Sequence, residues 1–146
     1  MKKHRIYVVE DDYGQAQLTI VALEDSFGDS IDIVHIATHH KFREKFEEIA
    51  ANLPLCIILD VMLPWSDTAI AEEPPSIESF LTAGFQCCEQ IRNDPRTTKI
   101  PILIYTVLDR SDIKGLPKNV DYLRKDSADQ RLIDWVKGAF EKAPRV

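Results

Sequence analysis

Residues 55–60 have the sequence LCIILD, five apolar residues followed by an acid. A short run that is apolar at every position is typical of a strand buried on both faces, as in the centre of a parallel sheet. In such sheets, ligands bind beyond the carboxyl ends of the strands. The run therefore predicts a central parallel strand that delivers its acid, Asp60, to the chemically useful edge of the sheet.

Four more short apolar runs lie on either side of this one, with amphipathic stretches between them. The expected strands cover residues 6–9, 31–37, 55–59, 102–105 and 120–123. The stretches between them carry apolar residues every three or four positions, which is the period of a helix with one buried face. The positions expected to face the core are Ala16, Ile20, Leu23 and Phe27 in the first helix, Phe42, Phe46, Ile49 and Leu53 in the second, Leu81, Phe85, Cys88 and Ile91 in the third, and Leu132, Val136, Ala139 and Phe140 in the last.

Local signals mark the ends of several helices. The first helix is expected to begin after Asp12 and to stop at Gly28, and Thr38 is expected to cap the second. Residues 127–130, Ser-Ala-Asp-Gln, resemble a capping box for the last helix. A further short helix is expected around residues 111–116.

Strand and helix alternate five times along the chain. This alternation predicts an α/β fold with a parallel sheet covered by helices on both faces. The expected class is a flavodoxin-like, doubly wound (βα)5 domain with strand order 2-1-3-4-5, and residues 1–146 are expected to form a single domain. Residues 61–79 contain three prolines and no clear period. They predict an inserted loop at about 65–80, longer than most loops of compact domains.

The composition argues against several classes of protein. The formal net charge is −6 and Lys and Arg form no dense cluster, so direct nucleic-acid binding is not expected. No apolar run is long enough to span a bilayer. The three cysteines, Cys56, Cys87 and Cys88, are odd in number and form no C-x-x-C pair. They favour buried free thiols in a reducing, cytoplasmic compartment.

Acidic residues follow the first and third expected strands. Glu10 and Asp11 follow the first strand, and Asp60 follows the third. In the flavodoxin-like order these two strands flank the point where the strand order reverses, so the three carboxylates should meet there. Hard oxygen ligands of this kind suit Mg²⁺, which binds through one or two carboxylates and through phosphate oxygens.

The ends of two more strands supply further polar groups. Thr106 ends the fourth strand with a hydroxyl, and Lys125 follows the fifth with a cation. A carboxylate, a metal ion, a hydroxyl and an ammonium group around one point can stabilise an in-line phosphoryl transfer. Each residue alone has an ordinary structural explanation, as a turn residue, a helix cap or a solvated side chain. Their joint placement at one sheet edge carries the prediction.

The motifs at these strand ends resemble those of response-regulator receiver domains in two-component signalling. Residues 8–12 (VVEDD) are similar to the family's first acidic motif, and residues 59–64 (LDVMLP) to its phosphoacceptor motif. Residues 100–106 (IPILIYT) resemble its fourth strand, and residues 121–125 (DYLRK) its fifth strand with an aromatic switch residue and a lysine. The resemblance spans nearly the whole chain and implies a stand-alone receiver of the chemotaxis type.

By position, this resemblance implies a phosphoacceptor beside a metal site. Asp60 would accept the phosphoryl group, Asp11 would bind the metal directly, and Glu10 would act through metal-bound water. The backbone carbonyl of Met62 would complete the protein's share of the coordination. The implied cofactor is Mg²⁺, for which Mn²⁺ can substitute.

The resemblance also implies a switch and its partners. Thr106 would hydrogen-bond the phosphoryl group, Lys125 would neutralise it, and Tyr122 would change rotamer. Such a chain is not an enzyme in the usual sense, because it catalyses only its own phosphorylation and dephosphorylation. The donor would be a histidine kinase or a phosphotransfer protein. A downstream protein would bind the fourth helix, fifth strand and fifth helix, or the inserted loop.

The chain departs from the family pattern in three places. The glycine that usually follows the phosphoacceptor motif closely is matched only by Gly84, which implies an insertion of about sixteen residues, the scale of a functional loop. Asp126 follows Lys125 where the family usually has proline, so a trans peptide is expected there. Val107 follows Thr106 where a smaller residue is common, and it is expected to narrow the access to the site.

Other functions fit parts of the pattern. The main alternative is a phosphorylation-independent, receiver-like adaptor, although the intact acidic set argues against it. A flavodoxin-like cofactor carrier needs a phosphate-binding loop after the first strand, where this chain has acids and only Gly14. A phosphatase of the haloacid-dehalogenase type needs a second acid at the position of Met62.

Overall fold

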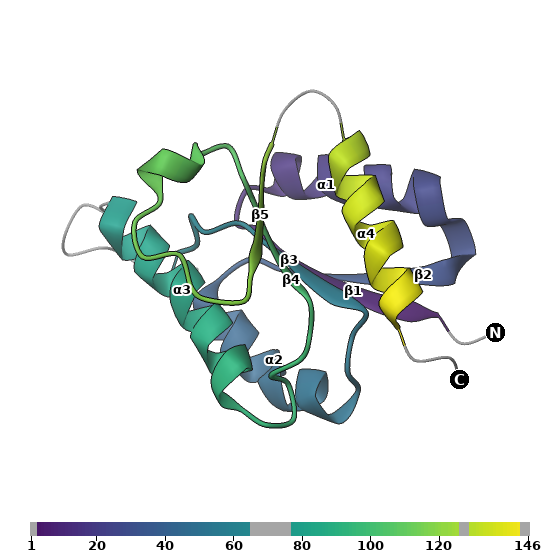
Figure 1. The fold of residues 1–146 in the computed structure, drawn as a ribbon, viewed down its shortest axis with the longest axis horizontal. Helices are drawn as coiled ribbons and strands as arrows, with labels where there is room; N and C mark the ends of the chain where they lie inside the picture. Colours follow the sequence, from purple (N-terminus) through teal and green to yellow (C-terminus); the bar gives the residue numbers. More distant parts are fainter. Residues whose placement is uncertain (1–2, 65–76, 126–128, 144–146) are drawn as a thin grey trace.

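A computed structural model of the chain describes residues 3–64, 77–125 and 129–143, with 77–82 described by their backbone alone. Its strands are β1 (His4–Val9), β2 (Ile31–Ile36), β3 (Cys56–Leu59), β4 (Ile102–Thr106) and β5 (Asp121–Arg124). Its helices are α1 (Tyr13–Phe27), α2 (His39–Ala51), α3 (Ile77–Asn93) and α4 (Gln130–Lys142), with short 3-10 helices η1 (Gly28–Ser30) and η2 (Arg110–Asp112). The strands form one parallel sheet in the order β2-β1-β3-β4-β5, which confirms the expected topology (Figure 1).

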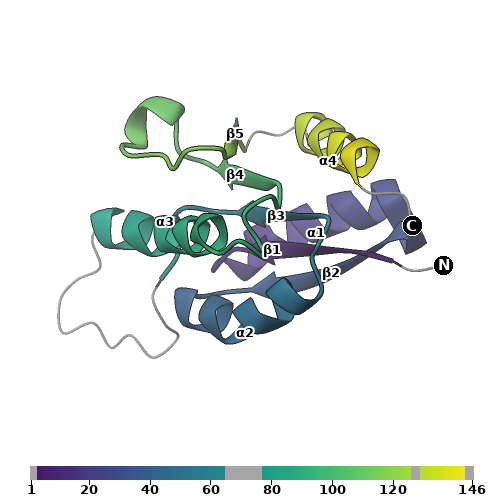
Figure 2. The same cartoon turned by 60° about the horizontal axis from the view of Figure 1, so that its bottom comes forward.

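Two helices cover each face of the sheet, α2 and α3 on one side and α1 and α4 on the other (Figures 1 and 2). The first pair packs around Phe42, Phe46 and Ile91, and the second around Leu23 and Leu132. β3 lies at the centre, and each of its residues is at most 2% exposed. The apolar run before Asp60 is therefore buried on both faces, as expected for a central parallel strand.

The expected helix caps are present at α1 and α2. The carboxylate of Asp12 accepts a hydrogen bond from the Gln15 N–H at 3.0 Å, and the Thr38 hydroxyl accepts one from the Lys41 N–H at 3.1 Å. Gly28 ends α1 with a positive φ of 54°, which glycine adopts without strain. The cap at Asp12 begins α1 directly after the acids that follow β1.

The prediction of a helix at residues 111–116 is wrong. Only the 3-10 turn η2 forms there, and Gly115 then takes a φ of 76°. The reason is that Ile113 alone is fully buried in this segment, so there is no apolar stripe to hold a helix against the sheet. The surface implied for output is therefore made of η2, β5 and α4 rather than of two helices and a strand.

Three smaller expectations also need correction. Leu53 lies beyond the end of α2 and is 60% exposed, because the chain turns outward at Asn52 before Pro54. Helix α3 begins at Ile77, inside the loop expected at 65–80, because Ile77 extends the apolar period of Leu81 by one turn. The N-cap of α4 is Asp129, whose carboxylate does not cap the helix because it bonds to Tyr105 instead.

Some expectations fall on residues outside the described ranges. Ser127 of the expected capping box and Asp126 are among them, so the trans peptide after Lys125 stays a prediction. Most of the inserted loop, residues 65–76, lies outside as well. The strand boundaries differ from the expected ones by a single residue at β2, β3, β4 and β5, and β1 begins two residues earlier than expected, at His4.

Backbone hydrogen bonds hold the residues beyond the strand ends in place. Glu10 N–H donates to Ile36 O at 2.9 Å, Asp60 N–H to Val9 O at 2.9 Å, and Lys125 N–H to Thr106 O at 2.7 Å. Each bond continues the pairing of the sheet by one residue. The side chains of Glu10, Asp60 and Lys125 are thereby delivered to the same edge of the sheet.

Candidate functional site

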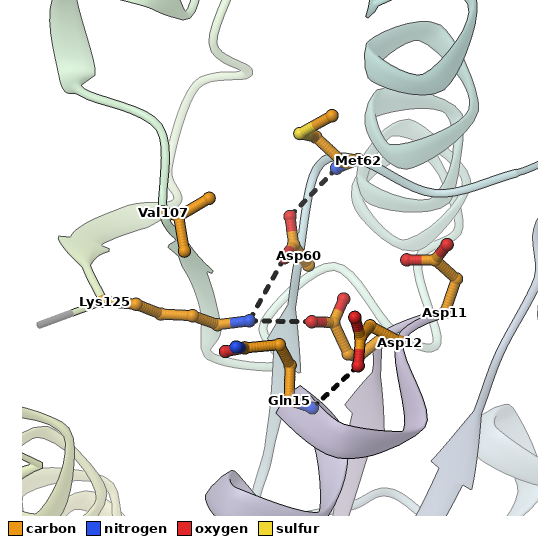
Figure 3. Close-up of a pocket in the computed structure, with 8 residues that line it drawn as sticks. Asp11, Asp12, Gln15, Asp60, Met62, Val107 and Lys125 are labelled. Carbon is orange, nitrogen blue, oxygen red and sulfur yellow. Dashed lines mark hydrogen bonds and ion pairs between the residues drawn. The ribbon is translucent and has the colours of Figure 1, made fainter. Parts of the chain in front are cut away.

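A pocket of about 300 Å³ lies at this edge, beyond the carboxyl ends of β1, β3, β4 and β5 (Figure 3). The residues that line it are Glu10, Asp11, Asp12, Gln15, Asp60, Met62, Val107 and Lys125. Most of these residues are expected at this edge from the sequence, but Gln15 is not. The signal was available, because the Asp12 cap places Gln15 in the first turn of α1, beside the acids.

Asp60 is held by one hydrogen bond to each of its carboxylate oxygens. Oδ1 accepts from the backbone N–H of Met62 at 3.0 Å, and Oδ2 accepts from the ammonium group of Lys125 at 3.1 Å. The residue is only 7% exposed, yet it lines the pocket. Its carboxylate is therefore oriented and still accessible to a small reactant.

Lys125 bridges two carboxylates. Its Nζ lies 2.8 Å from Glu10 Oε1 and 3.1 Å from Asp60 Oδ2, and its side chain is largely buried. Burial lowers the pKa of Lys125, but Asp60 and Glu10 outweigh that effect and raise it above its ordinary value. The amine is a fixed cation between the two acids, as a charge-neutralising role at this site requires.

The charged forms of Glu10 and Asp11 are destabilised at this site. Burial, followed by the neighbouring charge of Asp60, raises the pKa of Glu10 to about 8 despite the Lys125 contact. The same two causes raise the pKa of Asp11. Figure 3 shows Lys125 reaching Asp60 from one side, with Asp11 on the other. The region around Asp60 thus favours an additional positive charge.

The oxygen donors that line the pocket are of the chemical type that magnesium prefers. They are carboxylate oxygens, and the buried Oε2 of Glu10 has no hydrogen-bond partner. In the present conformation, no three acidic, His or Cys side chains of the described residues are grouped closely enough to hold a metal ion. Glu10 Oε1 is engaged by Lys125 instead.

Thr106 and Tyr122 lie beside the pocket rather than in its lining. Thr106 is fully buried, and its hydroxyl accepts from the Leu108 N–H at 3.4 Å. The Tyr122 hydroxyl donates to the carbonyl of Leu108. Val107, at 53% exposure, lines the pocket together with Lys125. Both expected switch residues therefore hold the loop after β4.

Gly84 brings helix α3 against the residue after Asp60. A Cβ at position 84 would lie 2.6 Å from the carbonyl oxygen of Val61 and 2.9 Å from its Cα. These partners are backbone atoms, so they cannot rotate away. This glycine therefore lies next to the segment that follows Asp60.

We expect Gly84→Ala to destabilise the chain by roughly 1–3 kcal/mol, the usual cost of overpacking. The matched control is Gly138→Ala in α4, where an added Cβ meets no atom within 4 Å. That substitution should stabilise by about 0.5–1 kcal/mol, because alanine loses less backbone entropy in a helix. Chemical denaturation of both variants measures the difference, and equal effects would contradict the close approach.

The raised pKa of Glu10 predicts how stability without metal depends on pH. The folded state holds the Glu10 proton up to about pH 8, whereas the ordinary value is 4.5. The folded state then binds more protons than the unfolded state, so this contribution to stability is full below about pH 4.5 and is lost as pH rises to about 8. Unfolding free energies measured in EDTA should fall more steeply over this range in wild type than in Glu10→Gln. Parallel curves would contradict the shift.

Comparisons with known proteins give a consistent result. No family model matches the chain. Response regulator PleD of Caulobacter vibrioides is 35% identical over 91 residues, 60% of this chain and 16% of PleD. The DNA-binding dual master transcriptional regulator RpaA of Synechocystis is 27% identical over 146 residues, 97% of this chain and 51% of RpaA. The matched part of the chain thus spans about half the length of RpaA and 16% of the length of PleD.

Solved structures decide the fold. The signal receiver domain of a histidine kinase from Clostridium thermocellum has a TM-score of 0.74 at 20% identity, with 96% of this chain and 99% of that chain covered. The chain has the receiver-domain fold. The receiver domain of sensor histidine kinase PA1611 from Pseudomonas aeruginosa, described with a magnesium ion in its active site cleft, has a TM-score of 0.64 at 19% identity, covering 97% and 100%.

These likenesses confirm the resemblance to response-regulator receiver domains and the flavodoxin-like fold. In doubly wound sheets, ligands bind beyond the carboxyl ends of the strands, which is the edge where the pocket of Figure 3 lies. Among the described residues, no helix is long and apolar enough to cross a membrane.

Proposed function

We propose that this receiver accepts a phosphoryl group on Asp60 from a phosphohistidine donor, in a reaction that depends on Mg²⁺. The observation that carries the proposal is the carboxylate of Asp60, which lies at the pocket between the Met62 N–H and the Lys125 ammonium group. Among contacts between the described residues, it is the one acid of the pocket that both a backbone donor and the buried cation orient. An oriented, accessible carboxylate is what a phosphoryl acceptor requires.

The transfer balances as a substitution at phosphorus. A carboxylate oxygen of Asp60 forms a bond to phosphorus while the bond from phosphorus to the donor's imidazole nitrogen breaks, and the imidazole keeps the electron pair and takes up a proton. Lys125 neutralises the phosphoryl oxygens. Thr106 donates its hydroxyl hydrogen to them. Its present long bond to Leu108 uses the oxygen as acceptor, so the hydrogen is not engaged there, but the side chain must turn toward the pocket because Thr106 is not part of the lining.

The proposed metal site uses residues already at this edge. Asp11 and Asp60 would bind Mg²⁺ directly, Glu10 through water, and Met62 through its backbone carbonyl, with Mn²⁺ as a substitute. When bound, the ion would supply positive charge that offsets the negative charge of the buried acids and of the incoming phosphoryl oxygens. The magnesium ion of the PA1611 receiver supports this assignment by analogy of fold.

The remaining proposals concern context. The chain catalyses only its own phosphorylation and dephosphorylation, with a histidine kinase or phosphotransfer protein as donor. Tyr122 changes rotamer when Thr106 turns, because both hold Leu108. A downstream protein then binds the face formed by η2, β5 and α4. The three free, buried cysteines support a cytoplasmic setting, and the net charge of −6 favours protein over nucleic-acid partners.

The test is labelling by a small phosphodonor such as phosphoramidate. With Mg²⁺ the chain should gain one phosphoryl group that is stable in acid and labile in base, as an acyl phosphate is. Removal of Mg²⁺ by EDTA should prevent it. A chain that stays unlabelled with Mg²⁺ would refute the proposal and favour the phosphorylation-independent adaptor.

A further inference from the structure

Tyr105 connects the cation of the site to the start of helix α4. It precedes Thr106 on β4 and is 4% exposed. The ammonium nitrogen of Lys125 lies over its ring, 5.7 Å from the ring centroid. Its hydroxyl donates to the carboxylate of Asp129 at 3.0 Å. One side chain therefore contacts residues on both sides of the segment between β5 and α4.

The Asp129 contact replaces an ordinary helix cap. Asp129 occupies the N-cap position of α4, where an acidic side chain usually accepts from the helix backbone. Here it makes no such bond and accepts from Tyr105 instead. Tyr105 also belongs to the same buried apolar cluster as Leu132 and Ile133 of this helix. The position of the ring is thus tied to α4 through both its polar and its apolar atoms.

The Lys125 contact limits where the ammonium group can go. Glu10 and Asp60 attract Nζ from the pocket side, and the ring of Tyr105 supports it through a cation–π contact. Without the ring, the long and flexible lysine would lose this contact and its ammonium group would have more space. The cation would then spend less time at the oxygen atoms that it must neutralise.

We infer that Tyr105 is a positioning residue for Lys125: its ring holds the ammonium group toward Asp60, and its hydroxyl fixes the ring to α4 through Asp129. This inference rests on the proposed function. Tyr105 also links the charge at Asp60 physically to the first turn of α4. A displacement of the ammonium group would change its contact with the ring, and the ring would transmit that change to Asp129.

The test compares three variants by the rate of labelling with phosphoramidate and by Mg²⁺ affinity. Tyr105→Leu removes the ring but keeps an apolar side chain in the core, and we expect labelling about tenfold slower, since small misplacements of a catalytic group have large effects. Tyr105→Phe keeps the ring and should lose about threefold at most. Asp129→Ala breaks the same hydrogen bond, so it should match Tyr105→Phe, and the double variant should be no slower than either.

Mg²⁺ affinity separates positioning from general damage to the site. Lys125 is not a proposed metal ligand and competes with the ion for Glu10 and Asp60, so Tyr105→Leu should keep or exceed the wild-type Mg²⁺ affinity while its labelling slows. Wild-type labelling speed in Tyr105→Leu, or a loss of Mg²⁺ affinity in proportion to the loss of rate, would overturn the inference alone. An unlabelled wild type would refute the proposed function and the positioning role with it.

Discussion

We expect Asp60→Asn to abolish labelling by a small phosphodonor while the chain keeps its fold. The amide has the shape of the carboxylate and can still accept from the Met62 N–H, which now bonds to Oδ1 at 3.0 Å. Its oxygen and nitrogen cannot form the acyl phosphate. The loss should be complete rather than partial, because the variant lacks the bond-forming group itself.

The same substitution should leave metal-free stability unchanged or higher. It removes one anion from a group of acids in which Asp60 raises the pKa of both Glu10 and Asp11. Lys125 keeps Glu10 as a partner at 2.8 Å. Unfolding by denaturant in EDTA measures this effect. Undiminished labelling of the Asn variant would move the acceptor to another residue, and a large loss of stability would show that the Lys125–Asp60 pair contributes more than the repulsion costs.

The second large effect is expected at Asp11. Asp11→Ala should weaken Mg²⁺ binding by at least about tenfold and slow labelling with it, because a direct carboxylate ligand is lost. Glu10→Gln should be milder, since its contact is proposed to pass through water. Calorimetric titration with Mg²⁺ gives the affinities, and labelling rates at saturating Mg²⁺ show how much of each loss extra metal restores.

Asp12 offers a matched control for charge. It lines the same pocket, but its carboxylate caps α1 by accepting from the Gln15 N–H. Asp12→Asn removes one negative charge next to Asp11 and keeps a capping side chain. It should change Mg²⁺ affinity far less than Asp11→Ala does. Equal losses in the two variants would mean that the site attracts the ion through its overall charge rather than through Asp11 as a ligand.

The sequence was sufficient for the framework because the framework follows from local patterns. The run LCIILD predicted the central strand, and the alternation of strands and helices predicted the parallel sheet in which β3 and its neighbours lie. The order 2-1-3-4-5 followed from the expected flavodoxin-like class and not from the alternation itself. The site residues could be placed because parallel strands end at one edge. The prediction of a helix at residues 111–116 was wrong because the apolar periodicity there is weakest, with Ile113 as the one fully buried residue of the segment.

Partner choice among side chains could not be predicted in the same way. Lys125 is 115 residues from Glu10 in the chain, and the two meet only because β1 and β5 end at the same edge. The carboxylate of Asp129 accepts from the Tyr105 hydroxyl instead of capping α4, against the local preference for an acidic N-cap. Such contacts are decided by packing between distant segments, which periodicity and spacing do not encode.

The most direct test of the account locates the phosphoryl group. The chain is labelled with phosphoramidate and Mg²⁺, reduced with borohydride, which converts an aspartyl phosphate to homoserine, and then digested and sequenced by mass spectrometry. The account predicts homoserine at position 60 alone, and none when EDTA replaces Mg²⁺. Conversion at Asp11, Asp12 or any other carboxylate in place of Asp60, or conversion at position 60 that is as complete in EDTA, would contradict it.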